Sequence, residues 1–183
     1  TVSKATRDSV KANTIIFDDQ KCHATVINDG IPAPKTTQKT NMFRDDRICI
    51  GLLGRLEAYK GHDDFLSAVA LLPENIRMQI SVEIIGGYSE QDGNRLKTII
   101  ENLDIADVVN IHGYVDAPTS EIILSLDLVA MMTKTFEGFG LTVIEALLCN
   151  VPVISTKQGI VPEIIPESNP LLVEVGEIDA IAQ

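Results

Sequence analysis

Short runs of Val, Ile and Leu alternate along most of the chain with stretches in which apolar residues recur every three or four positions. The runs are typical of buried strands, and the second pattern is typical of helices that cover a sheet. The predicted strands are Ile48–Leu53, Ile80–Ile85, Val108–Ile111, Leu126–Met132, Val151–Ser155 and Leu171–Val175. The predicted helices are His62–Leu72, Asp92–Leu103, Thr119–Leu124, Leu141–Leu148 and Pro162–Ile165. This order predicts an α/β domain: a Rossmann-like parallel sheet with helices on both faces.

The first part of the chain lacks this regular pattern. Residues 1–13 are compatible with a short polar helix, and Ala24–Asn28 predicts a brief strand that ends in the turn signal Asn-Asp-Gly. Residues 31–46 contain two prolines and show no periodicity, which fits a linker and a disordered tail equally well. We therefore expect the regular domain to occupy residues 44–183.

Charge and cysteine usage limit the classes of function. Residues 48–183 contain seven Lys and Arg against twenty Asp and Glu, out of a net charge of −11 for the whole chain. Such an acidic domain does not fit a nucleic-acid groove, which needs clustered basic side chains. Cys22, Cys49 and Cys149 form no zinc motif. The last two lie in apolar patterns and are predicted to be buried thiols, which suits a reducing cytoplasm.

The loop after the predicted strand Leu126–Met132 carries a glycine-rich turn. In a parallel sheet, ligands bind at the carboxyl ends of the strands. Glu137-Gly138-Phe139-Gly140 stands at such an end and leads into the helix at Leu141. Backbone N–H groups at a helix start bind phosphate, and glycine lets the anion approach them. A helix that simply begins after an acidic residue explains the same turn equally well.

The loop after Ile48–Leu53 carries basic residues. Arg55 and Lys60 are two of the seven basic residues of the acidic domain. An arginine can bind two phosphate oxygens at once, while a lysine supplies a mobile charge. The alternative is that both side chains are solvated and paired with Asp63 and Asp64. The glycines nearby do not complete a G-x-G-x-x-G fingerprint, so a nicotinamide oxidoreductase is a weak competitor.

Taken whole, the stretch Lys134–Asn150 resembles the E-x7-E signature of retaining family-4 glycosyltransferases, which have the GT-B fold. Glu137 and Glu145 stand at its two ends, with Gly-Phe-Gly-Leu and Glu-Ala inside. The segment Gly54-Arg55…Lys60-Gly61 resembles the element with which this family grips the donor diphosphate. The resemblance runs from residue 24 to the end of the chain, with the motifs in the family's order.

Three further segments resemble family motifs less closely. Gly86-Gly87-Tyr88 is similar to a G-x-G element with altered spacing, and Ile111–Val115 is similar to the segment that meets the nucleobase. We interpret His112 within it as structural rather than catalytic. Gln158–Glu163 resembles a G-G-x-P-E turn in which isoleucine replaces the second glycine. Glu163 is therefore either part of that motif or a solvated helix residue.

The resemblance implies a hexosyltransferase that moves a sugar from a UDP-, GDP- or ADP-linked donor to a glycan or a lipid-linked acceptor. Glu137 would face the sugar and Glu145 the ribose hydroxyls, while Arg55 and Lys60 would neutralise the departing diphosphate. Because this basic pair is present, we expect neither a metal ion nor another cofactor. The predicted catalytic residues are Glu137, Arg55 and Lys60. The predicted donor-binding residues are Gly54, Gly138, Phe139, Gly140, Leu141, Glu145, Gly113 and Tyr114.

The resemblance also implies the donor-binding half of a two-domain cytoplasmic enzyme. Residues 1–43 would be the end of the N-terminal acceptor domain and the linker. Residues 44–183 would be the nucleotide-sugar-binding domain, truncated before its final helix. The acceptor and any peripheral membrane contact would involve parts outside these residues, so we expect the 183 residues alone to be inactive. Two alternatives stay open: a non-catalytic nucleotide-sugar-binding subunit, and a GT-B relative that acts as an epimerase or a phosphorylase.

Overall fold

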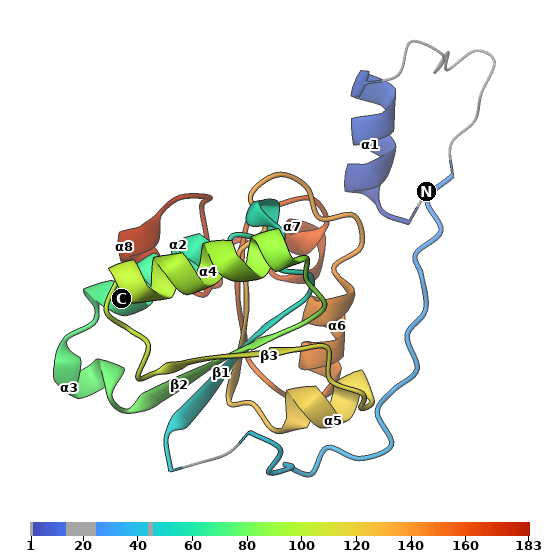
Figure 1. Ribbon diagram of the computed structural model, residues 1–183. Coiled ribbons are helices and arrows are strands. Elements are labelled where there is room, and N and C mark those ends of the chain that lie inside the picture. Colours follow the sequence, from blue (N-terminus) through green and yellow to red (C-terminus); the bar gives the residue numbers. More distant parts are fainter. Residues whose placement is uncertain (1, 14–24, 44–45) are drawn as a thin grey trace.

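One six-stranded sheet forms the centre of the structure, a computed structural model that describes residues 2–13, 25–43 and 46–183. All strand pairs are parallel, and the strand order is β3-β2-β1-β4-β5-β6 (Figure 1). The order reverses direction between β1 and β4, which makes their carboxyl ends the expected place for a ligand. The strands are β1 (Ile48–Leu53), β2 (Ile80–Ile85), β3 (Val109–Gly113), β4 (Leu128–Met131), β5 (Val153–Thr156) and β6 (Leu172–Val173).

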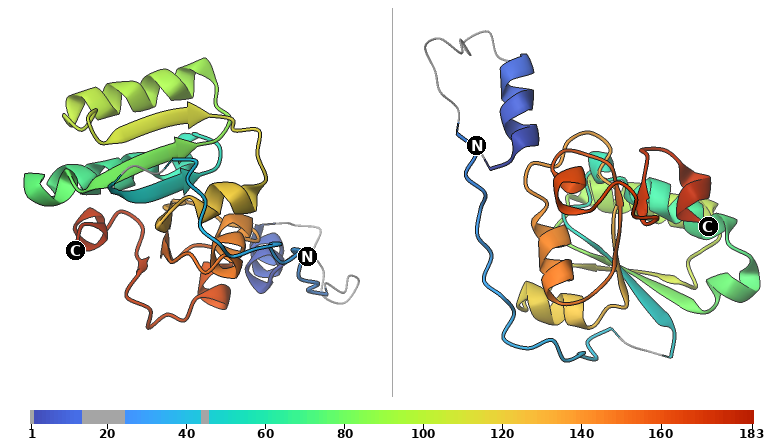
Figure 2. Two further views of the ribbon diagram at one scale, coloured as in Figure 1. Left: turned by 90° about the horizontal axis from the view of Figure 1, so that it is seen from below. Right: turned by 180° about the vertical axis from the view of Figure 1, so that it is seen from behind.

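Helices cover both faces of this sheet, as the alternating pattern predicts (Figures 1 and 2). One face packs against α2 (His62–Leu71), α4 (Glu90–Asn102) and α8 (Ile178–Ile181). The other packs against α5 (Thr119–Leu124), α6 (Leu141–Leu148) and α7 (Val161–Ile164). Three short elements, the 3-10 helix η1 (Ala58–Lys60), α3 (Glu74–Arg77) and α8, were not predicted, because none is long enough to show a period. The prediction of a Rossmann-like α/β fold is confirmed.

Alternation along each strand divides the apolar residues between two cores. Ile50 and Leu52 of β1 belong to the core under α2 and α4, whereas Cys49 between them faces the core under α5 and α6. Val129 and Ala130 of β4 divide in the same way. This is the two-residue period of a strand that is covered on both sides. Cys49 and Cys149 are both buried, as predicted.

Two glycines bring loops at the carboxyl edge into close contact. Gly61, before α2, has φ 71°, and a Cβ there would lie 1.9 Å from the carbonyl oxygen of Met132. Gly159, after β5, has φ 56°, and its Cβ would lie 1.8 Å from the carbonyl oxygen of Glu137. A side chain at either position is excluded both by the positive φ and by the neighbouring backbone. These contacts join the loops after β1, β4 and β5 into one surface.

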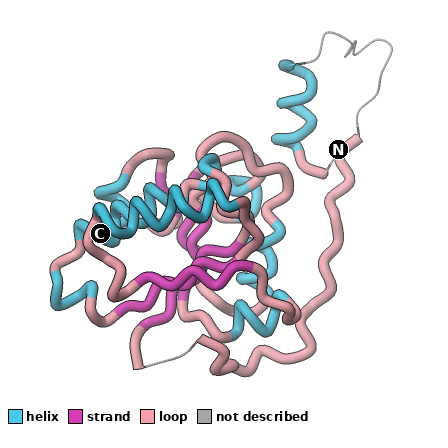
Figure 3. The backbone as a smooth tube through the Cα atoms, in the orientation of Figure 1, coloured by secondary structure: helices cyan, strands magenta, loops and turns pink. Residues whose placement is uncertain are grey.

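The N-terminal part of the chain lies beside the domain. The helix α1 (Lys4–Asn13) matches the predicted polar helix and stands to one side of the sheet (Figure 1). Residues 25–43 contain neither helix nor strand and run along the outside of the domain (Figure 3). The predicted strand Ala24–Asn28 is therefore wrong over residues 25–28, while Ala24 lies outside the described residues. The sheet ends at β3 and β6, and Ile27 is 73% exposed, so no burial supports a strand there.

The last residues before β1 are anchored under the domain. The Thr40 N–H donates to the Leu124 carbonyl at 3.0 Å, and the Thr40 hydroxyl donates to the Glu121 carbonyl at 2.8 Å. The Phe43 ring contacts the His112 ring with a centroid distance of 4.6 Å. His112 Nε2 in turn lies 2.5 Å from the buried carboxylate of Glu83 on β2. His112 therefore packs against Phe43 and contacts Glu83, while its interpretation as structural rather than catalytic stays a prediction.

Among the residues that the structure describes, no helix has the length and apolar character that a membrane span requires.

His62 is a buried histidine at the start of α2. It is 3% exposed, and its Nδ1 has no hydrogen-bond partner within the described part of the chain. Burial lowers the pKa of its imidazole to about 4, and the positive charge of Arg95 acts in the same direction. The neutral imidazole is therefore the form that the folded state accommodates.

We predict a loss of stability on acidification that depends on His62. An unfolded histidine has a pKa of about 6.5, so the contribution of His62 is complete above that pH and falls as the pH drops towards 4. Between pH 7.5 and 4.5 the free energy of unfolding should fall by about 2–3 kcal/mol from this group. Urea unfolding at both pH values should show a smaller fall for His62→Gln than for the wild type. An equal fall in both proteins would contradict the assignment.

Candidate functional site

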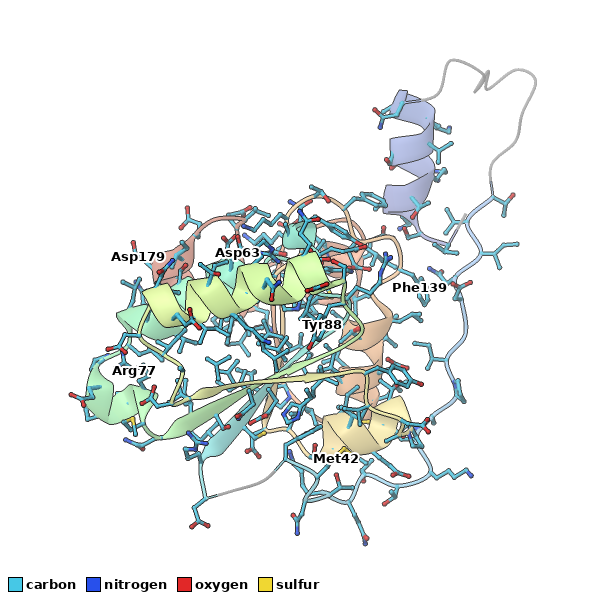
Figure 4. All side chains as sticks on the ribbon, in the orientation of Figure 1. Met42, Asp63, Arg77, Tyr88, Phe139 and Asp179 are labelled. Carbon is cyan, nitrogen blue, oxygen red and sulfur yellow. The ribbon has the colours of Figure 1, made fainter. Side chains whose placement is uncertain are left out.

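The loops after β1, β2, β4 and β5 meet at the carboxyl edge of the sheet. The Lys134 N–H donates to the Tyr59 carbonyl at 2.7 Å, which ties the loop after β4 to the loop after β1. The Ile160 N–H donates to the Glu137 carbonyl at 3.0 Å and ties in the loop after β5. In Figure 4, Asp63, Tyr88 and Phe139 lie towards this edge, whereas Met42 lies at the opposite end of the domain.

The glycine-rich turn presents a run of backbone N–H groups to which the described part of the chain offers no acceptor. Gly140 precedes α6 in the left-handed conformation, with φ 71°, and no side chain caps the helix. Within the described residues, no group accepts a hydrogen bond from the backbone N–H of residues 138–143. These donors stand at the positive end of the α6 dipole. The geometry is suited to an anion. Binding of the donor by Gly138, Phe139, Gly140 and Leu141 stays a prediction.

Glu137 and Lys60 form an ion pair beside this turn. Lys60 Nζ lies 3.1 Å from Glu137 Oε2, and the Thr133 hydroxyl donates to the same oxygen at 3.2 Å. The Lys60 and Glu137 side chains are 23% and 15% exposed, and Thr133 is fully buried. The structure thus joins two of the three predicted catalytic residues and adds Thr133, which sequence analysis missed. Its position directly after an apolar strand was the available signal.

Arg55 does not join this pair. Its guanidinium lies 3.1 Å from Glu57 Oε1 and donates to the Tyr59 hydroxyl at 3.2 Å. The side chain is 69% exposed and lines a separate pocket of about 230 Å³ with Gly87 and Tyr88. Arg55 is therefore at the same edge of the sheet as Glu137, but the structure places no direct contact between them.

The alternative pairing of Arg55 and Lys60 with Asp63 and Asp64 is wrong. Those two carboxylates instead bind Lys134 Nζ, at distances of 3.0 and 2.7 Å. Burial acts to lower the pKa of the Lys134 ammonium, but its hydrogen bonds to Asp64 and Asp63 outweigh this effect, so the pKa is raised overall. Because Lys134 occupies both carboxylates, Lys60 is left to Glu137.

Glu145 lies on α6 and faces a pocket that neither Lys60 nor Glu137 lines. Its carboxylate is half-buried and receives no hydrogen bond from any described residue, and burial raises its pKa. It lines a pocket of about 410 Å³ between the linker residues 31–36, α5 and α6. Burial also raises the pKa of the neighbouring Cys149 thiol, and the charge of Glu145 adds to the effect. A partly desolvated carboxylate without donors is suited to bind hydroxyl groups.

The remaining predicted donor-binding residues lie at the ends of β1 and β3, on either side of β2. Gly54 follows β1, and its N–H donates to the Ile85 carbonyl at 3.0 Å. Gly113 ends β3 with φ 72°, and its carbonyl accepts from the Gly86 N–H at 2.8 Å. Tyr114 is 78% exposed. Their backbone is therefore engaged in joining neighbouring strands, while the Tyr114 side chain stands free at the surface.

Glu163 on α7 is exposed but is not merely solvated. Its carboxylate accepts hydrogen bonds from the Ala5 N–H at 2.9 Å and the Lys4 N–H at 3.4 Å. These groups form the first turn of α1, more than 150 residues earlier in the chain. The sequence offered no signal for this contact.

Within the described ranges, no cluster of three or more His, Cys, Asp and Glu side chains is arranged to hold a metal ion.

Comparison with known proteins identifies the class of this domain. A sequence model described as "Glycosyl transferases group 1" matches residues 35–183. The chain belongs to the glycosyl transferases group 1 family. The predicted resemblance to GT-B glycosyltransferases is confirmed at this level.

Individual relatives agree with the assignment. A D-inositol 3-phosphate glycosyltransferase of Corynebacterium jeikeium is 37% identical over 120 residues, which are 62% of this chain and 28% of that relative. The structure of Anabaena HepE in complex with UDP and glucose has a TM-score of 0.68 at 26% identity, over 75% of this chain and 37% of HepE.

A Rickettsia africae glycosyltransferase has the same fold over 100% of this chain and 50% of its own, with a TM-score of 0.77 at 20% identity. The chain spans about a quarter to a third of the length of the curated relatives that it matches.

Proposed function

We propose that residues 44–183 are the donor-binding domain of a retaining, cytoplasmic glycosyltransferase that transfers a sugar from a nucleotide-sugar to a glycan or lipid-linked acceptor. The observation that carries this proposal is the run of backbone N–H groups over residues 138–143, for which the described residues supply no acceptor, with the Lys60–Glu137 pair beside it. A negatively charged diphosphate is the ligand that such a helix start and a neighbouring ammonium would bind together. The crystal structures of HepE with UDP and with UDP-glucose support a ligand of this class.

In this proposal the residues of the site stabilise the leaving group. The bond from the anomeric carbon to the diphosphate oxygen breaks, a bond from that carbon to the acceptor oxygen forms, and the proton of the acceptor hydroxyl passes to the departing diphosphate. Negative charge then increases on the diphosphate, where Lys60 and the amides of the glycine-rich turn would offset it. Arg55, across the loop, would approach the same phosphates from its exposed position. No metal ion or further cofactor is needed for this charge balance.

Glu137 would face the sugar. Its Oε2 is engaged by Lys60 and Thr133, so it is held in place and its charge is partly balanced. This supports a role in orienting the sugar, with the diphosphate itself assisting departure on the same face, rather than a role as a free nucleophile. Glu145, in its pocket beside the linker, would accept hydrogen bonds from the ribose hydroxyls.

Two other functions use the same geometry. A non-catalytic subunit would bind the nucleotide-sugar but would need a partner for transfer. A GT-B relative would isomerise or phosphorolyse the sugar. The test is turnover by the full-length protein with UDP-, GDP- and ADP-sugars, after a thermal-shift comparison of these donors. Free nucleotide together with a new glycoside supports the transferase, whereas an isomerised sugar, a sugar phosphate, or binding without turnover overturns it.

We predict different roles for Glu137 and Glu145. Glu145→Gln should weaken a free nucleoside diphosphate and its nucleotide-sugar by similar factors, because both contain the ribose. Each charge-assisted hydrogen bond lost is worth about 1.5–3 kcal/mol, or roughly tenfold or more in affinity. Glu137→Gln should leave the affinity for the free diphosphate nearly unchanged while turnover collapses.

Isothermal titration with nucleotide and with intact donor measures both effects. The exposed Glu101 on α4 provides the matched control, and Glu101→Gln should change neither affinity. If Glu137→Gln weakened the bare nucleotide as much as Glu145→Gln does, the assigned roles would be wrong.

We predict that Lys60→Ala and Arg55→Ala in the full enzyme lower turnover more than donor affinity. The physical reason is that the charge of the leaving group is greater in the transition state than in the ground state. Steady-state kinetics with Arg77→Ala as the control separates kcat from KM, since Arg77 lies on α3 away from the site. An increase in KM alone, with kcat unchanged in both variants, would contradict this prediction. It would mean that the two residues contribute only to binding of the donor.

A further inference from the structure

The first turn of α1 is capped by a residue from the domain. The Ser3 hydroxyl accepts from the Thr6 N–H at 2.9 Å, which is an ordinary N-cap. The two preceding amides, of Lys4 and Ala5, donate to the Glu163 carboxylate on α7. A carboxylate at the positive end of a helix makes a favourable charge-assisted contact. The start of α1 is therefore completed by the surface on which it rests.

A second contact of α1 falls on the glycine-rich turn. The Ser3 and Thr6 hydroxyls lie 2.9 and 3.1 Å from the Gly138 carbonyl oxygen, and Ser3 is fully buried. The Gly138 carbonyl and the Phe139 N–H belong to one planar peptide unit and point in opposite directions. Holding the carbonyl therefore also sets the direction of that N–H. Hydroxyl groups that bond to the oxygen also polarise the unit and make its N–H a stronger donor.

Both contacts fall on one connected unit of the domain. The Ile160 N–H donates to the Glu137 carbonyl, and Gly159 packs directly on the same carbonyl. The turn that carries Gly138 and the short helix that carries Glu163 are therefore joined by backbone contacts. Because α1 forms hydrogen bonds to this unit at both Gly138 and Glu163, it limits the movement of the glycine-rich turn. In Figure 4, Phe139 lies on the side of the domain nearest α1.

We propose that α1 positions the anion-binding turn, with Ser3, Thr6 and Glu163 as positioning residues that act through the Gly138–Phe139 peptide. This inference rests on the proposed function, because it assigns α1 control over the affinity for the donor diphosphate. Docking of α1 holds the Phe139 N–H in the direction that binds the anion. By thermodynamic linkage, a bound nucleoside diphosphate also strengthens the docking of α1.

The test uses Thr6→Val, which removes the hydroxyl at nearly constant shape, and Glu163→Gln, which removes the charge. Titration of the wild-type 183-residue chain with UDP, GDP and ADP first identifies the diphosphate that binds. Each variant should lower the affinity for that diphosphate about three- to tenfold, the range expected for one such hydrogen bond. Thr6→Ser keeps the hydroxyl and should restore wild-type affinity. Glu167→Gln, which removes an exposed carboxylate that has no contact with α1, is the charge-matched control.

A second measurement separates this inference from the proposed function. In the labelled chain without ligand, the carbonyl ¹³C resonance of Gly138 and the amide ¹⁵N resonance of Phe139 should shift in Thr6→Val, and the order parameters of residues 138–141 should fall. Thr6→Ser should show neither change. If no nucleotide binds the wild type, the proposed function fails, and these resonances alone decide whether α1 positions the turn.

Two results overturn the inference. One is an unchanged turn in both Thr6→Val and Glu163→Gln. The other is a loosened turn without any loss of affinity in a chain that binds nucleotide.

Discussion

The contacts between the loop after β1 and the loop after β4 hold the candidate site together. Gly61 rests on the Met132 carbonyl, Lys134 binds the two aspartates at the start of α2, and Lys60 binds Glu137. The two strands are neighbours in the sheet, so a displacement of one loop also displaces the other. Opposite charges that are partly buried interact more strongly than solvated pairs, provided each charge keeps its partner. These ion pairs therefore help to fix the geometry of the turn, in addition to setting the charge of the site.

This constraint shows how a mostly acidic domain can still hold basic side chains in place for a negatively charged ligand. The few basic side chains at the carboxyl edge are each matched to a carboxylate: Arg55 to Glu57, Lys60 to Glu137, and Lys134 to Asp63 and Asp64. Without ligand, these carboxylates keep the cations in place. A bound diphosphate would compete with Glu137 for Lys60 and with Glu57 for Arg55. Lys134 would remain paired with Asp63 and Asp64. The local balance of charge thus matters more than the net charge of the domain.

Most of the fold could be predicted from the sequence, because strands buried on both faces have long apolar runs and the helices between them have a clear period. The ends of elements were less certain: β4 begins at Leu128 rather than Leu126, and β6 has only two residues. Of the four-residue helices, α7 was predicted only approximately, and α3 and α8 were missed. A helix of this length is too short to show the repeat that reveals it. The strand expected near Ala24 failed because a local preference cannot form a strand without a neighbour to pair with.

The site was predicted in part. Strand ends and glycines placed Glu137, Lys60 and the turn at one edge, but their pairing could not be read from the sequence. Lys60 had nearer carboxylates in the chain, and only the close approach at Gly61 brings it to Glu137. Glu163 was harder still, because its partners are backbone amides, which every sequence contains. Local caps favour certain residue types, but a contact between a side chain and main-chain amides that are distant in the sequence leaves no such pattern.

The anchoring of Thr40 at α5 has a consequence for α1. Because the chain is fixed to the domain at Thr40, α1 is attached to the surface it contacts by a tether of limited length. A tether converts an encounter between two bodies into a local event, and it keeps the effective concentration of α1 near its contact surface high. Hydrogen bonds such as those of Lys4 and Ala5 with Glu163 would hold two separate molecules only weakly. Here the same contacts act on a helix that is always close by, so the docking of α1 needs less contact energy than the association of a separate molecule would.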